Sequence, residues 1–284
     1  MKGLIGAILL YSASAQTPAF RSTVELVTVP CSVLDSSGAP VTGLTIDDFR
    51  VFDNGVPRTI QHLWIDNDQP LTLAVLLDAS ESQQDQLAEH RKTAQALLDR
   101  VLRAGDQAFI VSVGRDVRLL PDLASTSGNL FGDPCALRVC GSSPLWNALY
   151  DAARLKLLSR AGNKAILILT DGFDSGSTRT WRQAADEAHK AEAAVYAIQY
   201  PGAFGGKYAP DLYRLTDEAG GATFHAPPVP IEHIVSRIET DLRHRYVLGF
   251  RPEKLTGKIR HDLRVELSRP NLTVRARKTY FQPQ

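Results

Sequence analysis

The sequence contains aspartate and serine side chains at spacings that could bind a metal ion. They are Asp78, Ser80, Ser82 and Asp171, with Ser143 or Ser142 as a further hydroxyl. Their carboxylate and hydroxyl oxygens, with no histidine or cysteine nearby, suit Mg²⁺, Mn²⁺ or Ca²⁺ rather than zinc or copper. The alternative is a purely structural role, because Asp and Ser also form turns and cap helices.

Two apolar segments must position the aspartates. Residues 71–77 and 164–170 are rich in aliphatic side chains and predict strands that are buried on both faces, as in the middle of a parallel sheet. Parallel strands end at the same edge of a sheet, so Asp78 and Asp171 would lie close together there. Two carboxylates at such a distance repel each other and are costly to desolvate. A divalent cation would remove both penalties.

The segments around these strands alternate between helix and strand. Helical patterns cover 84–102, 145–158, a segment from Ser177 or Thr178 to 191, 210–219 and 231–242. Strand patterns cover 107–113, 117–120, 194–200 and 222–225. This alternation predicts an α/β fold, with a doubly wound, mostly parallel sheet flanked by helices. Lys164, which precedes its strand, would lie at the edge opposite the aspartates.

Both ends of the chain predict short strands instead. These strands fall within 24–34 and 49–52, and over 246–250, 262–267 and 272–281. The last segments alternate apolar and charged residues, which is typical of a half-exposed antiparallel sheet. We therefore expect an α/β domain, residues 67–245, inserted in a small β-sandwich-like domain that both chain ends form, residues 16–66 and 246–284.

Three basic residues of the last predicted strand have two interpretations. Arg275, Arg277 and Lys278 could form a binding patch. We favour a solvated strand face whose charges protect the edge of the sheet.

Composition and the first residues of the sequence bear on partners and location. The chain has 32 Lys and Arg against 31 Asp and Glu, so no basic field favours nucleic acid. Lys2, an apolar run over 4–10 and the small residues 13–15 predict a signal peptide over residues 1–15, the alternative being a short buried strand. No later stretch is long and apolar enough to span a membrane. We expect the mature chain to be secreted, or periplasmic and associated with the cell envelope.

The three cysteines fit an oxidising compartment. Cys135 and Cys140 flank four residues and could form a local disulfide bond. The alternative, a pair of zinc ligands, lacks two further ligands at suitable spacing. Cys31 lies in an apolar-rich run and is expected to be a buried core residue.

Three motifs occur in order on the predicted strand ends. They are Asp78-x-Ser80-x-Ser82, Gly141-Ser-Ser143-Pro-Leu and Thr170-Asp171-Gly172. Together they resemble the metal-ion-dependent adhesion site (MIDAS) of von Willebrand factor A (VWFA) domains, over roughly residues 68–245. The flanking segments, including 41–55 and 269–281, are similar to those of exported VWFA-related proteins of acidobacteria. This second resemblance covers nearly the whole mature chain.

The resemblance implies a role for each site residue. Ser80 and Ser82 would bind the metal directly, and Asp78 and Asp171 mainly through water or hydrogen bonds. Ser143 stands where the family usually has threonine and keeps the hydroxyl, while Ser142 remains a possible substitute. An open coordination position would take an Asp or Glu carboxylate from a partner protein, which suits Mg²⁺. Asp174 could order an outer water or form a loop turn.

The leading hypothesis is therefore a divalent-cation-dependent protein-binding module for adhesion or interaction, not an enzyme. The alternative is a metal-assisted hydrolase or phosphatase that uses the same Asp and Ser residues. The sequence contains no G-x-x-x-x-G-K-[ST], G-x-S-x-G or H-E-x-x-H motif to support it. His225, close to a predicted strand end, is the one histidine to test as a base, and a structural role is its alternative.

Overall fold

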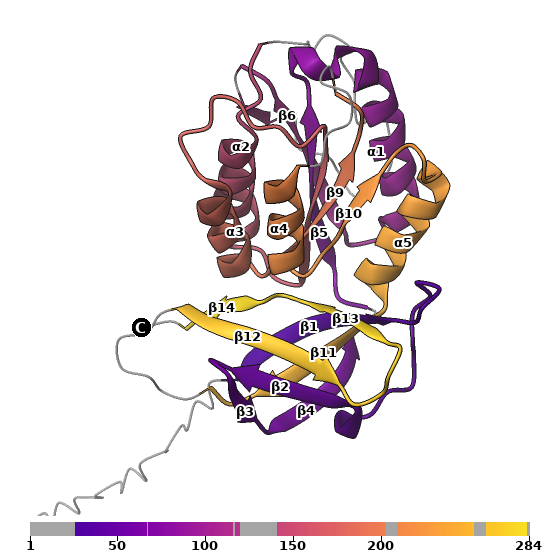
Figure 1. The fold of residues 1–284 in the computed structure, drawn as a ribbon, viewed down its shortest axis with the longest axis vertical. Helices are drawn as coiled ribbons and strands as arrows, with labels where there is room; N and C mark the ends of the chain where they lie inside the picture. Colours follow the sequence, from indigo (N-terminus) through magenta and orange to yellow (C-terminus); the bar gives the residue numbers. More distant parts are fainter. Residues whose placement is uncertain are drawn as a thin grey trace, which may run out of the picture.

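The computed structural model describes residues 26–66, 68–115, 117–119, 141–202, 209–252 and 260–282. The predicted signal peptide and the Cys135–Cys140 pair lie outside these ranges. The chain forms an α/β part and a smaller all-β part, and the all-β part contains strands from both ends of the chain (Figure 1). No helix in the described ranges is long and apolar enough to cross a membrane.

The α/β part is built on a six-stranded sheet with the order β10-β9-β8-β5-β6-β7. The strands are β5 (Leu71–Asp78), β6 (Gln107–Val113), β7 (Val117–Leu119), β8 (Asn163–Thr170), β9 (Ala193–Gln199) and β10 (Thr223–His225). All neighbours pair in parallel except β7, which is an antiparallel edge strand. Every residue of β5 and β8 is buried, so these two strands form the centre of the sheet. The predicted fold class is confirmed.

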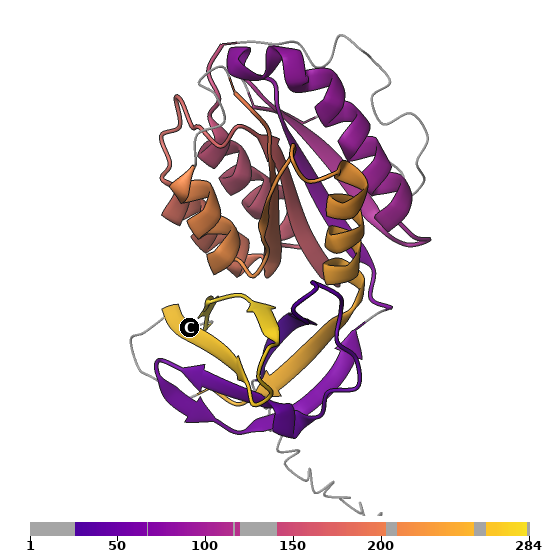
Figure 2. The same ribbon diagram turned by 45° about the vertical axis from the view of Figure 1, so that its right-hand side comes forward.

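Helices cover both faces of this sheet (Figure 2). They are α1 (Leu87–Val101), α2 (Leu145–Asp151), α3 (Trp181–Lys190), α4 (Pro210–Glu218) and α5 (Ile231–Arg243). Side chains of β5 alternate between the faces: Leu73, Val75 and Leu77 share a core with α1 and α5. Ala74 and Leu76 share the other core with α2, α3 and α4. The uninterrupted apolar run of β5 is therefore explained by burial on both faces.

Two predicted helix starts differ from the structure. The segment expected to be helical from residue 84 begins as a 3₁₀ helix, Glu81–Gln86, before α1. The helix expected after Ser177 or Thr178 starts at Trp181, because Thr180 is its N-cap. The Thr180 hydroxyl accepts a hydrogen bond from the Gln183 amide, and the Gln183 side chain accepts one from the Thr180 amide. This capping box outweighs the earlier hydroxyl residues as a start signal.

Strands from before residue 67 and after residue 244 form two four-stranded sheets, β13-β1-β11-β4 and β14-β12-β2-β3. The strands are β1 (Val27–Leu34), β2 (Phe49–Asp53), β3 (Val56–Arg58), β4 (Ile60–Asp66), β11 (Arg245–Phe250), β12 (Arg260–Leu267), β13 (Thr273–Ala276) and β14 (Thr279–Phe281). Side chains of the two sheets share one apolar core. Cys31 lies in it at 2% exposure as a free thiol, as predicted.

The strand predicted over 272–281 is interrupted, and its basic residues contact the α/β part. Arg277 forms an isolated bridge with Ala219, and the Lys278 amide donates to the Glu218 carbonyl at the end of α4. The Arg277 guanidinium is buried and pairs with Glu192 at 3.0 Å. Both predictions for Arg277, a residue on a solvated strand face and a residue of a binding patch, are therefore wrong. The sequence pattern of the strand does not show that the end of α4 packs against this residue.

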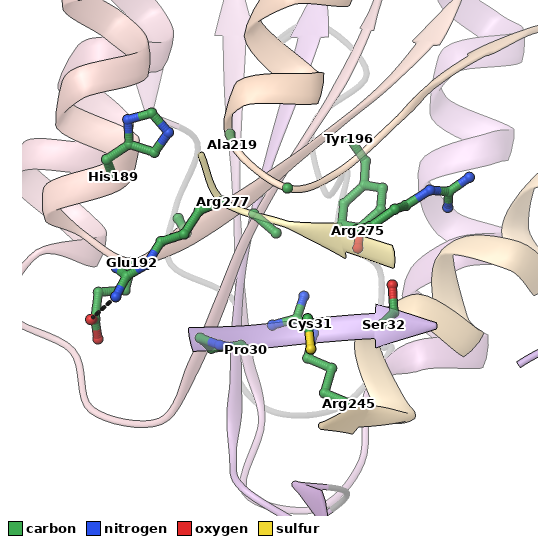
Figure 3. Close-up of a pocket in the computed structure, with 13 residues that line it drawn as sticks. Pro30, Cys31, Ser32, His189, Glu192, Tyr196, Ala219, Arg245, Arg275 and Arg277 are labelled. Carbon is green, nitrogen blue, oxygen red and sulfur yellow. Dashed lines mark ion pairs between the residues drawn. The ribbon is translucent and has the colours of Figure 1, made fainter. Parts of the chain in front are cut away.

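The junction between the two parts is polar (Figure 3). The carboxyl end of α5 runs through His244 into β11, and Asp241 of α5 pairs with Arg275. The Arg245 Nε also donates to the Asp241 carbonyl at 3.0 Å. Because helix carboxyl ends carry partial negative charge, these arginines complement the edge of the α/β part that faces the β-sheets. A cavity of about 20 Å³, room for about one water molecule, remains beside Arg277.

Candidate metal centre

The five site residues predicted from the sequence lie together at the carboxyl edge of the central sheet. The chain leaves β5 towards β6 on one side and later returns to β8 on the other side. β5 and β8 are paired in register up to Leu77 and Leu169, so the residues that follow them emerge side by side. Open α/β sheets form their ligand-binding crevice at such a switch in strand order.

A continuous chain of hydrogen bonds connects the five residues. The Ser143 hydroxyl donates to Asp78 Oδ2 at 3.1 Å, and Asp78 Oδ1 accepts from the Ser80 amide at 3.0 Å. The hydroxyls of Ser80 and Ser82 are 3.1 Å apart. Ser82 Oγ donates to Asp171 Oδ2 at 2.7 Å. The structure therefore brings Asp78, Ser80, Ser82, Ser143 and Asp171 into one cluster.

Asp78 is the most deeply buried carboxylate of the cluster. Its side chain has 0% exposure, and this burial raises the pKa of Asp78 above its usual value. The charge of Asp171 raises the pKa of Asp78 further, whereas hydrogen bonds from Ser80 and Thr170 oppose the rise. A positive charge at the cluster would lower the cost of keeping both carboxylates ionised.

The loop that carries Ser143 is held by the segment after β8. The Ser143 amide donates to Ser175 Oγ at 2.8 Å, and the Ser175 amide donates to the Ser143 carbonyl at 2.8 Å. Asp174 accepts from the Trp146 amide at 3.1 Å and from the Ser177 hydroxyl at 2.5 Å. Asp174 therefore stabilises the loop after β8 and the start of α2. This agrees with the loop-turn role that was one of its two predicted roles.

Of the two serines in the second motif, Ser142 and Ser143, Ser143 is the one that contacts the cluster. Its side chain is 3% exposed and faces Asp78. The Ser142 hydroxyl instead lies beside Gly176, where a Cβ would be 3.4 Å from it. The two neighbouring hydroxyls therefore point to different surroundings.

Two buried polar residues of the cluster had no predicted role. Thr170 Oγ1 donates to Asp78 Oδ2 at 2.6 Å and accepts from the Gly172 amide at 3.0 Å. Gln83, with 0% exposure, donates to Asp171 Oδ2 at 3.2 Å. The position of Thr170 in the third motif could have indicated its contact with Asp78. Nothing in the sequence indicates that Gln83 turns inwards, because it follows the first motif in a polar run.

The donor set fits a hard divalent cation. Mg²⁺ binds oxygens at about 2.0–2.1 Å in an octahedron, so adjacent ligands are about 3 Å apart. The hydroxyls of Ser80 and Ser82, which are expected to bind the metal directly, are 3.1 Å apart, close to this value. In the described part of the chain, no three His, Cys, Asp or Glu side chains converge as a metal-binding group. A cation here would therefore rely on serine hydroxyls, which suits Mg²⁺ better than zinc.

Two other sequence candidates lie away from the cluster. Lys164 pairs with Thr72 at the start of the strands, at the opposite edge as predicted, and its Nζ donates to the Arg160 carbonyl at 3.0 Å. His225 ends the outermost strand, β10, and its Nε2 contacts the Tyr213 hydroxyl. Since β9 separates β10 from β8, His225 lies about two strand spacings, roughly 10 Å, from the end of β8.

Comparisons with known proteins agree with this fold. No protein-family model matches the chain, and no curated protein matches its sequence. Among solved structures, proximal thread matrix protein 1 from the mussel byssus is similar at 16% identity, with a TM-score of 0.51, over 76% of this chain and 50% of that chain. A second structure of that protein, with a zinc-occupied MIDAS motif, is similar at 16% identity and a TM-score of 0.51, over 68% of this chain and 50% of that chain.

The match to the mussel protein spans half of that protein's length. The VWA domain of SpRpn10 is also similar, at 16% identity and a TM-score of 0.47, over 60% of this chain and 95% of that chain. At such low identity the likeness concerns the fold alone. The α/β part of the chain has the fold of a VWFA domain, with the five residues at the edge of the sheet where the sequence predicted a MIDAS.

Proposed function

We propose that the chain is a divalent-cation-dependent protein-binding module and not an enzyme. The observation that carries the proposal is the convergence of Asp78, Ser80, Ser82, Ser143 and Asp171 at the carboxyl edge of β5 and β8. Ser80, Ser82 and Ser143 would hold Mg²⁺ through their hydroxyls. Asp78 and Asp171 would hold it mainly through water and hydrogen bonds. Mn²⁺ or Ca²⁺ would be alternative ions.

The bound cation would supply a Lewis-acidic position for a carboxylate from the partner protein. The residues of this chain would fix the approach of that carboxylate. Asp171 Oδ1 accepts from the Phe173 amide at 3.0 Å, and Phe173, two residues after Asp171, is 38% exposed. Aromatic residues are enriched in protein–protein interfaces. We infer that the partner presents an Asp or Glu beside an apolar side chain.

One similar structure supports a metal role for this fold, since that mussel protein has zinc in its MIDAS motif. Our choice of Mg²⁺ rests instead on the all-oxygen donor set of this chain. Export to the periplasm or the cell exterior rests on the signal peptide predicted over residues 1–15.

The test is metal binding by the purified chain, followed by partner capture. Isothermal titration with Mg²⁺, Mn²⁺, Ca²⁺ and Zn²⁺ should show one site, lost in Asp78→Ala. Asp85→Ala is the matched control, because Asp85 is an exposed aspartate in the 3₁₀ helix Glu81–Gln86, three residues after Ser82. The wild-type chain and Asp85→Ala should capture a partner protein from envelope extract in the presence of the metal. EDTA should abolish this capture, and Asp78→Ala should capture no partner.

The absence of metal binding, together with unchanged capture by Asp78→Ala, would refute the proposal. Turnover of a phosphoester that disappears in Asp171→Ala would instead support the hydrolase or phosphatase alternative. A panel of phosphoesters with and without Mg²⁺ is therefore part of the same experiment.

A further inference from the structure

Gln83 is a buried amide in direct contact with the candidate metal centre. It follows Ser82 in the 3₁₀ helix Glu81–Gln86 and has 0% exposure. Its Nε2 lies 3.2 Å from Asp171 Oδ2, 3.1 Å from the Ser82 carbonyl and 3.2 Å from the Pro201 carbonyl. One side-chain amide thus connects the first motif, the second aspartate and the segment after β9.

The burial of this amide is costly for the fold. An amide has two donor hydrogens, and here they serve three acceptors. The Gln83 Oε1 is buried without a hydrogen-bond partner among the residues that the structure describes. An unsatisfied buried acceptor is costly. An apolar side chain of similar size would avoid this cost, but it could not donate to Ser82, Asp171 or Pro201. Core packing alone therefore does not account for a glutamine at position 83.

The segment after β9 encloses the same carboxylate from another side. A Cβ built on Gly202 would lie 2.4 Å from Asp171 Oδ2, so this glycine packs directly against the Asp171 side chain. Pro201, which precedes it, is the residue whose carbonyl Gln83 holds. Asp171 Oδ2 is consequently fixed by Ser82 Oγ, by the Gln83 amide and by the close approach of Gly202.

We propose that Gln83 is a positioning residue for the metal centre. It orients the Asp171 carboxylate and holds Pro201 and Gly202 against it, so that the oxygens keep the arrangement in which a cation binds. This inference rests on the proposed metal-dependent function. Partners of metal-binding groups typically change metal affinity by 10–100-fold when they are replaced.

The test compares two substitutions at Gln83 with one at a matched glutamine. Gln83→Met keeps the volume but removes the donor, and we expect it to weaken Mg²⁺ and Mn²⁺ binding about tenfold in isothermal titration. Gln199→Met is the control. Gln199 is 3% exposed and donates to the main-chain carbonyl of Asp171 at 2.8 Å, not to the carboxylate. We expect its metal affinity to stay within about twofold of the wild type, even where the fold loses stability.

Gln83→Glu gives a second readout that does not require the Met variant to fold. It adds a negative charge beside Asp171, so the metal-free chain should be less stable than the wild type. Mg²⁺ should then raise the melting temperature of Gln83→Glu by more than that of the wild type. If side chain 83 did not face Asp171, the added charge would lower the melting temperature equally with and without metal.

The inference is wrong if Gln83→Met binds metal as tightly as the wild type, or if Mg²⁺ raises the melting temperatures of Gln83→Glu and the wild type equally. These outcomes differ from the failure of the proposed function, in which the wild type itself binds no metal.

Discussion

Burial of two histidines, His90 and His189, should make the stability of the protein fall in mild acid. His90 of α1 is 0% exposed, and its ring lies 4.5 Å from that of Tyr200. His189 of α3 is 1% exposed, and its Nε2 lies 2.9 Å from the Glu218 carbonyl at the junction with the β-sheets. Burial lowers the pKa of His90 to about 3 and that of His189 to about 4, from an ordinary value of 6.5.

The direction of the effect follows from the lowered pKa values. In the unfolded chain both rings take up a proton below pH 6.5, whereas in the folded chain they stay neutral until about pH 3 and about pH 4. Proton uptake by the unfolded state therefore favours unfolding as the pH falls below 6.5. Between pH 7.0 and 5.5 each histidine should remove about 1.2 kcal/mol from the free energy of unfolding. The two together should remove about 2.5 kcal/mol.

The assay is urea denaturation at pH 7.0 and 5.5, in EDTA so that metal binding does not contribute. His189→Gln, which keeps a donor near the Glu218 carbonyl, should lose about 1.2 kcal/mol less than the wild type between the two pH values. His90→Phe should show the same reduction. His244→Gln is the matched control, because this histidine is exposed, and its loss should equal that of the wild type. The reasoning is refuted if His189→Gln and His90→Phe lose as much stability as the wild type.

Three further substitutions test other contacts. Thr170→Val removes the donor to Asp78 at 2.6 Å and should lower the free energy of unfolding by about 1–2 kcal/mol in EDTA, measured with urea; an unchanged midpoint would contradict this. Gly202→Ala should weaken Mg²⁺ binding in isothermal titration, because its Cβ would lie 2.4 Å from Asp171 Oδ2. Wild-type affinity would show that the backbone at position 202 shifts to accommodate the methyl group. Arg277→Met removes the contacts to the Thr28 carbonyl at 2.7 Å and to Glu192. It should cost about 2 kcal/mol in thermal unfolding and leave metal affinity unchanged, since the junction lies at the edge opposite the metal centre.

Much of the fold follows from local patterns in the sequence. The apolar run from Leu71 and the strand that ends at Thr170 predict buried parallel strands, since both faces of such strands are covered by helices. Polar residues that directly follow such strands must lie at one edge of the sheet. For this reason the sequence alone places Asp78, Ser80 and Asp171 in one cluster.

The tertiary structure decided the contacts between segments that are distant in the sequence. Gln83 has no signal in its own neighbourhood, and its role arises because Asp171 and Pro201 come to lie beside it. Arg277 resembles an edge-strand charge until the end of α4 reaches it. The choice between Ser142 and Ser143 likewise depends on which hydroxyl the loop turns towards Asp78. Secondary structure and the sheet edge are set by patterns within a few residues, whereas hydrogen bonds at the site depend on packing that joins residues about 90 positions apart.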